Sequence, residues 1–266
     1  MNRIDKKFKE LKDKKKKAFI AFITAGYPDL KKTKELVLNF EKSGVDIIEL
    51  GVPFSDPLAD GATIQSASYQ ALQKGVTLEK ILKLVAEIRK ASEIPITFMS
   101  YYNPIFHYGE KRFVEHAKKC GVDGVIIPDL PPEEATELIS TAKKNDFSTV
   151  FFLSPTTKKS RVKNIIKASS GFIYFVSVSG VTGARTQNQF SASIKGKIQE
   201  ARKLTKKPIC IGFGISNPQQ VKQMSGISDG VIVGSAIVSE IAQNVGKKDL
   251  VKNVSKYVSE LTKVLN

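Results

Sequence analysis

Several residue types and patterns are scarce in this sequence, and each scarcity excludes a class of protein. Among 266 residues there are two cysteines, Cys120 and Cys210, too few for a disulfide framework or a cysteine-based zinc site. The two histidines, His107 and His116, are not spaced as a metal-binding pair, and no cluster of cysteines or carboxylates accompanies them. No apolar run approaches the roughly 18 residues that a membrane-spanning helix needs. The sequence therefore predicts a soluble protein of the reducing cytoplasm that holds no metal.

Arginine is also scarce, although the chain is strongly basic. The formal net charge is +16, and 36 of the 42 basic residues are lysine. Recognition of bases and bidentate contacts to phosphate favour arginine, and the sequence shows no RNA-binding aromatic motif, zinc finger or helix-turn-helix pattern. The lysines are scattered through periodic segments, as solvated helix faces would place them. We interpret the charge mainly as a lysine-rich surface; a nucleic-acid binder, with salt-sensitive affinity, is the alternative.

What the sequence does contain is a regular alternation of short apolar runs with helical stretches rich in Lys and Glu. Strands are predicted at 18–25, 46–51, 95–101, 124–129, 148–154, 171–178, 208–213 and 229–234. Helices are predicted at 33–43, 62–73, 77–91, 110–120, 133–145, 158–169, 191–204, 217–225 and 247–265. Before the first strand, Ile4, Phe8 and Leu11 recur at helical spacing and predict an amphipathic N-terminal helix.

Eight strands, each followed by a helix, predict a parallel sheet, because parallel neighbours need crossover connections. The length is close to the roughly 250 residues of a (β/α)8 barrel, and no linker or second composition regime interrupts the chain. The predicted fold is therefore α/β, a (β/α)8 TIM barrel that forms a single domain over residues 1–266. In such barrels the active site lies at the carboxyl ends of the strands.

The most informative loop follows the second predicted strand. In that strand Ile47 and Glu49 share one face, opposite that of Ile48. An apolar setting at a strand end raises the pKa of a carboxylate toward the range useful for general acid–base catalysis. Asp60 lies at the far end of the following loop, so the two carboxylates can bracket a ligand. The structural alternative makes Glu49 a salt-bridge partner and Asp60 the cap of the next helix.

Glycine-rich turns follow the seventh and eighth predicted strands. Gly214 allows close approach of the backbone to a ligand, and the nearby Asn217–Pro218 is typical of a helix N-cap and first turn. Gly234 and Ser235 begin another short helical segment. Two helix amino termini offer free N–H groups to an anion, at the usual phosphate position of such a barrel. Ordinary turn glycines are the alternative, and the spacing lacks the third glycine of a dinucleotide fingerprint.

Taken in order along the chain, these motifs are similar to those of the tryptophan synthase alpha chain family. The similarity covers nearly the whole sequence and is most specific in the thirteen residues from Glu49 to Gly61. The matching motifs are Phe22–Pro28 (FITAGYP), Glu49–Gly61 (ELGVPFSDPLADG), Tyr102–Pro104 (YNP), Ser179–Ala184 (SGVTGA), Gly212–Ile215 and Gly234–Ser235.

The resemblance implies a lyase of tryptophan biosynthesis. Members of the family cleave indole-3-glycerol phosphate by a retro-aldol reaction to indole and glyceraldehyde 3-phosphate, without a cofactor. By motif position, Glu49 is then the acid–base residue, Asp60 the second catalytic carboxylate and Tyr174 an active-site tyrosine. The phosphate is expected on the backbone around Gly183, Gly214, Gly234 and Ser235. The indole is expected among Phe22, Met99, Tyr101, Ile126, Leu153 and Phe213, with Thr182 above it.

The resemblance also implies a partner, because free indole would be lost to bulk water and across membranes. The family's beta chain takes indole directly and joins it to serine on pyridoxal phosphate, so an α2β2 heterotetramer is expected. Its contacts should lie in loops on the active-site face. The residues expected there are Asp56, Asn103, Pro104 and Pro131. Two alternatives from the residues alone are another phosphate-binding barrel, which should lack the Glu49–Gly61 loop, and a non-catalytic barrel that binds an indole-like signal.

Overall fold

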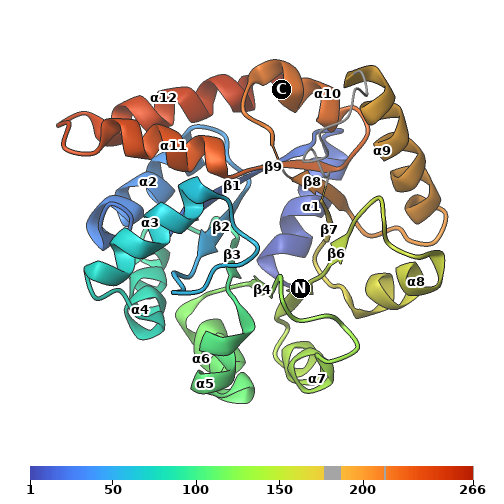
Figure 1. Cartoon of the computed structure of the whole chain (residues 1–266), viewed down its shortest axis with the longest axis horizontal. Helices are drawn as coiled ribbons and strands as arrows, with labels where there is room; N and C mark the ends of the chain where they lie inside the picture. The colour runs from blue at the N-terminus through green and yellow to red at the C-terminus, as the bar shows by residue number, and fades with distance from the viewer. Residues whose placement is uncertain (177–186, 213, 266) are drawn as a thin grey trace.

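The computed structural model describes residues 1–176, 187–212 and 214–265. Parallel strands form the centre, and helices surround them (Figure 1). The strands are β1 (Ala18–Thr24), β2 (Ile47–Gly51), β3 (Ile96–Met99), β4 (Gly124–Ile126), β5 (Ser148–Val150), β6 (Phe152–Leu153), β7 (Ile173–Val176), β8 (Ile209–Gly212) and β9 (Gly230–Val233).

The helices cover the outside of the strand ring, with the exception of α1. They are α1 (Arg3–Asp13), α2 (Leu30–Lys42), α3 (Ala62–Gln73), α4 (Leu78–Arg89), α5 (Tyr102–Tyr108), α6 (Glu110–Cys120), α7 (Thr136–Lys144), α8 (Lys159–Ala168), α9 (Gln187–Arg202), α10 (Pro218–Ser225), α11 (Ser235–Asn244) and α12 (Leu250–Thr262), followed by a short 3-10 turn (Lys263–Leu265). Looking along the barrel, α1 is seen in the middle of the ring (Figure 1). No helix in these described ranges is both long and apolar enough to cross a membrane.

The sheet closes on itself through one segment of chain. In the order of hydrogen-bonded neighbours, β5 stands at one end and β6 at the other. These two strands are consecutive in sequence and are separated only by Phe151. The first pairs with β4 and the second with β7, and the backbone N–H of Tyr174 donates to the carbonyl of Phe151 at 3.1 Å. The predicted (β/α)8 barrel is confirmed.

Three local predictions are wrong. The predicted strand 148–154 is divided at Phe151, because its first part pairs with β4 and its second with β7. Residues 102–108, predicted without a helix, form α5; Pro104 lies in its first turn, where a missing N–H breaks no intrahelical hydrogen bond. Helix α2 begins at Leu30 rather than at 33, because the Asp29 side chain accepts a hydrogen bond from the N–H of Lys32 and caps the helix there.

Alternation along the strands produces two cores. Side chains that point outward pack against the surrounding helices, and side chains that point inward fill the barrel. In β2, Ile48 belongs to the outer core and Ile47 to the inner core. Glu49 lies on the same side as Ile47 and reaches the cavity at the top of the barrel. The predicted shared face of Ile47 and Glu49 is confirmed, and it directs the carboxylate toward the barrel axis.

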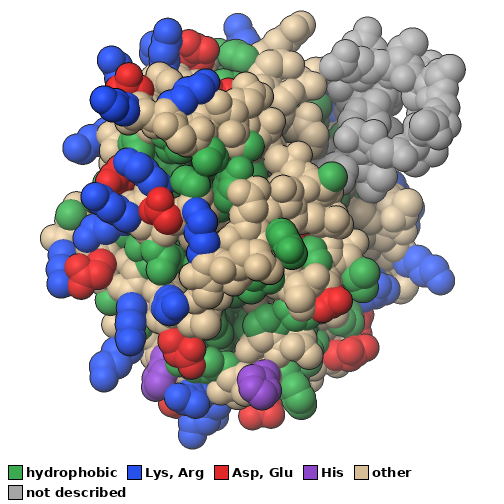
Figure 2. Space-filling model, turned by 60° about the vertical axis from the view of Figure 1, so that its left-hand side comes forward, with side chains coloured by type: hydrophobic (Ala, Val, Ile, Leu, Met, Phe, Trp, Pro, Cys, Tyr) green, Lys and Arg blue, Asp and Glu red, His purple; other side chains and the backbone are tan. Residues whose placement is uncertain are grey.

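Basic side chains are spread over the surface and interspersed with acidic ones. The face in Figure 2 shows Lys and Arg side chains with Asp and Glu among them. Several lysines pair within their own helix, as Lys14 does with Glu10 and Lys32 with Glu35, each at 2.7 Å. Exposed pairs of this kind add little to stability, because water and salt screen the charges. On this face the charge is distributed as expected for solvated helices.

Gly230 in β9 and Gly196 in α9 should respond in opposite ways to replacement by alanine. A Cβ at Gly230 would lie 2.8 Å from the Cys210 sulfur and 2.9 Å from the Cβ of Ala18. Gly230→Ala should therefore overpack the barrel and lower the free energy of unfolding by about 1–3 kcal/mol. A Cβ at Gly196 meets no described atom within 4 Å, so Gly196→Ala should raise it by about 0.5–1 kcal/mol, since alanine favours helix. Urea unfolding followed by circular dichroism measures both, and equal midpoints for the two variants would contradict this packing.

Candidate active site

A cavity of about 610 Å³ opens at the carboxyl ends of the strands, where a barrel of this kind carries its chemistry. Two carboxylates, those of Glu49 and Asp60, face it. Apolar side chains from several strands form one wall, and the turn before α10 and the amino terminus of α11 form another. The cavity therefore combines acid groups, an apolar surface and backbone N–H groups.

Glu49 is the buried acid of this cavity. Its side chain is completely buried, and neither carboxylate oxygen has a hydrogen-bond partner within the described part of the chain. Burial without such a partner raises the pKa of Glu49 to about 8, because the charged form loses its hydration. Glu49 is therefore mostly protonated at neutral pH. The alternative in which it is a salt-bridge partner does not hold, since no described basic residue pairs with it.

Asp60 is the second carboxylate, and its environment differs from that of Glu49. It is half-buried in the loop between β2 and α3. Burial raises its pKa, whereas a hydrogen bond with the Tyr101 hydroxyl opposes that shift by stabilising the charged form. The same hydroxyl accepts a hydrogen bond from the N–H of Ala59 at 2.8 Å and so ties down the end of the loop. Asp60 does not cap α3, because Gly61 is the N-cap and no side chain bonds there.

Tyr174 lies on the inner side of β7 beside these acids. Its ring centroid is 4.8 Å from that of Phe152, and its hydroxyl reaches so close to Gly212 that a Cβ there would collide with it. Burial first, and then the negative charge of Glu49, raises the pKa of Tyr174 well above its ordinary value. The Tyr174 side chain therefore stays neutral, and it gives the cavity wall an aromatic surface with one hydroxyl group.

Glycines make room for an aromatic side chain at the mouth of the cavity. A Cβ at Gly51 would lie 2.7 Å from the Phe22 ring, and one at Gly234 would lie 3.3 Å from it. Phe22 fills the space left by both glycines and lines the cavity with Met99. These contacts explain why glycine rather than a larger residue stands at the ends of β2 and β9.

The turn before α10 and the amino terminus of α11 reach the cavity from the side of β8 and β9. Asn217 caps α10, and its side chain accepts a hydrogen bond from the N–H of Gln220 at 2.9 Å. Gly214 lies in the turn before α10 with φ of +74°, a backbone conformation that residues with a side chain rarely adopt. Helix α11 begins at Ser235 with Gly234 as its N-cap, and no side chain caps this terminus. Uncapped N–H groups and the helix dipole favour an anion at this wall.

Most of the residues predicted from the sequence come together here. Those that line the cavity are Phe22, Glu49, Asp60, Met99, Tyr174, Gly214, Gly234 and Ser235. Tyr101 lines a small adjoining hollow that shares Phe22, Asp60 and Met99 with it. Ile126 is fully buried in the inner core, below the lining. Thr182, Gly183 and Phe213 lie outside the described residues.

The assignment of Leu153 to the cavity wall is wrong. Leu153 belongs to the outer core between the strands and the helices, whereas its neighbour Phe152 lines the cavity. Successive side chains of a strand point to opposite faces, so an error of one residue exchanges the two. Ile64, Val176 and Ile232 also line the cavity and were not predicted. Alternation from Tyr174 identifies Val176, but no sequence signal distinguishes Ile64 from other residues of its helix.

The residues predicted to contact a partner lie at the rim of the same face. Asp56 and Asn103 are exposed, and Pro104 and Pro131 are half-buried. The start of α5 is held in place because the N–H of Tyr102 donates to the Asp129 carboxylate at 2.9 Å. Nearby, Leu58 is 94% exposed and Phe106 is 66% exposed. Leu58 precedes α3 in the loop after β2, and Phe106 lies in α5 after β3, so both belong to segments at the carboxyl ends of the strands.

The described residues contain no group of three or more His, Cys, Asp and Glu side chains that is placed to hold a metal ion. Cys120 is half-buried and Cys210 is buried, and both are free thiols.

The fold and the cavity together define a class of protein, a (β/α)8-barrel enzyme with a buried acid at the strand ends and helix amino termini beside it. Comparison with known proteins gives the family. The model of the tryptophan synthase alpha chain family matches residues 8–266. The chain therefore belongs to the tryptophan synthase alpha chain family. It is accordingly a lyase of tryptophan biosynthesis that carries out the alpha reaction.

Individual relatives agree with the family assignment over the full length. The alpha chain of Geotalea daltonii is 48% identical over 261 residues, which cover 98% of each chain. That of Thermoanaerobacter sp. is 47% identical over 265 residues, which cover 100% of each chain. The crystal structure of the alpha subunit from Legionella pneumophila superposes with a TM-score of 0.91 at 36% identity, and the match covers 100% of this chain and 98% of that one.

The raised pKa of Glu49 should appear in the pH dependence of stability. The native carboxyl titrates near pH 8 and the unfolded one near its ordinary value of 4.5, so between these values the native state binds more protons. The wild-type protein should therefore lose stability as pH rises from about 5 to 8, by roughly 3–5 kcal/mol from this group alone. Glu49→Gln should remove that loss, whereas Glu115→Gln, on the exposed side of α6, should retain it. Urea unfolding across this pH range measures the difference. If the free energy of unfolding of the wild type and of Glu49→Gln changed with pH in parallel, the pKa of Glu49 would not be raised in the native protein.

Proposed function

We propose that this chain cleaves indole-3-glycerol phosphate to indole and glyceraldehyde 3-phosphate by a retro-aldol reaction that uses no cofactor. The observation that carries this proposal is Glu49, a fully buried, unpartnered acid that faces the cavity. The volume of about 610 Å³ lies within the range for a small-molecule site. Its apolar wall suits an indole ring, and its helix termini suit a phosphate.

Catalysis begins with protonation of the indole ring. Indole is a poor leaving group until its C3 carbon is protonated, which converts the ring to an indolenine with positive charge on nitrogen. Glu49 supplies this proton, because its pKa of about 8 keeps it protonated at neutral pH while leaving it acidic enough to react. Asp60, which bonds with the Tyr101 hydroxyl, stabilises the charge on the ring nitrogen as a carboxylate.

Cleavage of the carbon–carbon bond follows, and in this step the proton moves from the substrate to Glu49. Glu49, now ionised, takes the proton from the glycerol hydroxyl on the carbon attached to C3. The carbonyl of glyceraldehyde 3-phosphate forms, the carbon–carbon bond breaks, and its electron pair returns to the ring and neutralises the nitrogen. Glu49 is protonated again at the end of the cycle. The two carboxylates can divide this work because their surroundings differ, one dry and one hydrogen-bonded.

The other residues that line the cavity bind and orient the substrate. Phe22, Met99 and Phe152 provide apolar contacts for the ring. Tyr174 contributes a neutral hydroxyl that limits how the ring and the glycerol chain can lie. The phosphate binds the backbone N–H groups at Gly234 and Ser235 and the turn at Gly214, since a helix terminus without a side-chain cap leaves such donors free. Roles for Gly183, Thr182 and Phe213 stay predictions.

The partner is a tryptophan synthase beta chain, and we propose an α2β2 heterotetramer. A related structure, at 28% identity and a TM-score of 0.89, is that of tryptophan synthase from M. tuberculosis in an aminoacrylate-bound form. The rim of the active-site face, with Leu58 and Phe106 exposed, supports docking there. Indole then passes to the partner without entering bulk water. Pyridoxal phosphate belongs to the beta chain in this proposal.

Glu49→Gln should abolish proton transfer while it preserves the shape of the site. The amide cannot donate the ring proton as an acid, so turnover of indole-3-glycerol phosphate should fall at least about a hundredfold. Binding of glycerol phosphate, measured by calorimetry, should change little, because the helix termini are untouched. The matched control is Glu79→Gln, an exposed residue of α4. If Glu49→Gln kept more than about a tenth of wild-type turnover, the residue would be structural.

The isolated chain should be a weakly active monomer that the cognate beta chain stimulates. Leu58→Ser and Phe106→Ser should each weaken that association, because a solvent-exposed apolar side chain contributes mainly when an interface buries it. Leu204→Ser is the control, since Leu204 is 47% exposed but lies between α9 and β8, at the opposite end of the barrel. Size-exclusion chromatography with the beta chain, with cleavage rates measured with and without it, tests the proposal. If the two chains do not co-elute at micromolar concentrations and the beta chain does not increase the cleavage rate, the proposed partner is wrong.

A further inference from the structure

Helix α1 presents one apolar face to the interior of the barrel. Ile4, Phe8 and Leu11 are buried along that face, at the spacing of successive helical turns. All three belong to the inner core, together with strand residues that point toward the barrel axis. The Phe8 ring centroid lies 5.9 Å from that of Phe172, just before β7. α1 is therefore packed against the inside of the barrel, whereas the other helices cover the outside.

The strands leave space for this helix at their amino-terminal ends. Small residues stand at the inward positions there, namely Ala18 in β1, Gly124 in β4, Ser148 in β5 and Gly230 in β9. These positions are too small to fill the barrel by themselves. The apolar face of α1 supplies the missing layer of side chains, and without it the lower end of the interior would be open to water.

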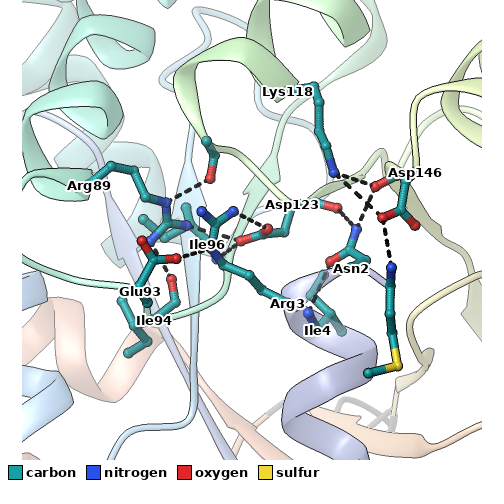
Figure 3. Close-up of polar contacts among 12 residues, drawn as sticks. Asn2, Arg3, Ile4, Arg89, Glu93, Ile94, Ile96, Lys118, Asp123 and Asp146 are labelled. Atoms are coloured by element: carbon teal, nitrogen blue, oxygen red, sulfur yellow. Dashed lines mark hydrogen bonds and ion pairs between the residues drawn. The ribbon is translucent and has the colours of Figure 1, made fainter.

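An ion-pair network centred on the buried Asp123 anchors the start of α1 to the barrel (Figure 3). Arg3 binds Asp123 at 3.0 Å and Glu93 at 2.6 Å, and Arg89 holds the other Asp123 oxygen at 3.0 Å. The Asn2 side chain donates to the Asp123 carbonyl at 2.6 Å and accepts a hydrogen bond from the N–H of Ile4. The Asp123 side chain is only 1% exposed, so this anchor fixes the register of α1 against β4 and α4.

The inner core is continuous from α1 to the floor of the cavity. The group of side chains that contains Phe8 also contains Tyr174 and Ile232, and both of these line the cavity. Met99 and Phe152 pack against the same group from above. The inner core therefore lies between the apolar face of α1 and the catalytic pocket and contacts both.

We propose that α1 is a positioning element for the reaction, because its apolar face, with Phe8 at the centre and Arg3 as the anchor, seals the amino-terminal end of the barrel and keeps water away from Glu49. The proposal deepens the proposed function and rests on it for the catalytic consequence. The contacts of α1 are with the strands and not with the substrate, so it acts through Glu49.

The surroundings of Glu49 explain why exclusion of water matters. The titratable groups that interact with it from other strands of the ring are Tyr174 in β7 and Cys210 in β8, and Asp60 faces the same space from above. None of these groups carries positive charge or compensates an ionised Glu49. Dryness alone holds the proton on this acid. Water that entered from below would hydrate the carboxylate and favour its ionised form.

The test compares Phe8→Ala and Arg3→Gln with Lys9→Ala, an exposed position of the same helix. In the wild type, kcat/KM for indole-3-glycerol phosphate cleavage should fall as pH rises through about 8, because the protonated acid is the active form. Phe8→Ala and Arg3→Gln should move that midpoint to lower pH by about one unit or more, toward the value of a hydrated carboxyl. Lys9→Ala should leave it in place.

A second measurement does not depend on activity. The infrared carbonyl band of the protonated Glu49 acid, identified by its loss in Glu49→Gln, is titrated in each variant, and its midpoint should move with that of kcat/KM. If Phe8→Ala does not fold, Phe8→Leu and Arg3→Gln carry the test. Lower activity with both midpoints unchanged would overturn the proposal and make α1 merely structural. An infrared midpoint that moves while the kcat/KM profile stays in place would support the seal but reject Glu49 as the acid of the proposed reaction.

Discussion

The structure depends on one constraint: a carboxyl group must remain in a dry apolar interior and still reach a ligand. Inside a protein such a group is tolerated in its neutral form, and Glu49 has no described partner that would stabilise its charge. The strand alternation that points Glu49 inward, the inner core beneath it and the packing of α1 all serve the same condition.

The chemistry of the cavity follows from the different surroundings of groups that face the same small space. Glu49 loses hydration and gains nothing in return, whereas Asp60 keeps a hydrogen bond with Tyr101 and partial access to solvent. Across the cavity, the uncapped start of α11 offers donors without adding a basic side chain. An anion can therefore bind at that wall without a lysine or arginine that would also stabilise ionised Glu49. This separation suits a reaction that needs an acid and an anionic substrate in one pocket.

Much of the fold and part of the site could be predicted from sequence, because both depend on short-range patterns. The alternation of apolar strands and helices predicts the barrel, and the inward face of Glu49 follows from the period of a strand. The error at Leu153 has a different origin. Inner and outer side chains alternate without a break from Val150 to Leu153, but all four of these residues are apolar, so the sequence alone does not show which of the two faces points to the barrel axis. Pro104 similarly suggested a loop, although a proline is tolerated in the first turn of a helix such as α5.

The pairing of β1 with β9 has a consequence for how the molecule assembles. Ala18 and Gly230 are partners in this ladder, although they come from opposite ends of the chain. Bringing such distant segments together costs loop-closure entropy before any contact between them compensates for it. The successive β1–β5 ladder contains only neighbours in sequence, so it can form first and leave the ring open as a curved half-barrel. Ring closure at β1 and β9 is then the late step, and until it occurs the edge of β1 is an unpaired strand edge, the feature of an incompletely folded chain that most readily recruits another copy.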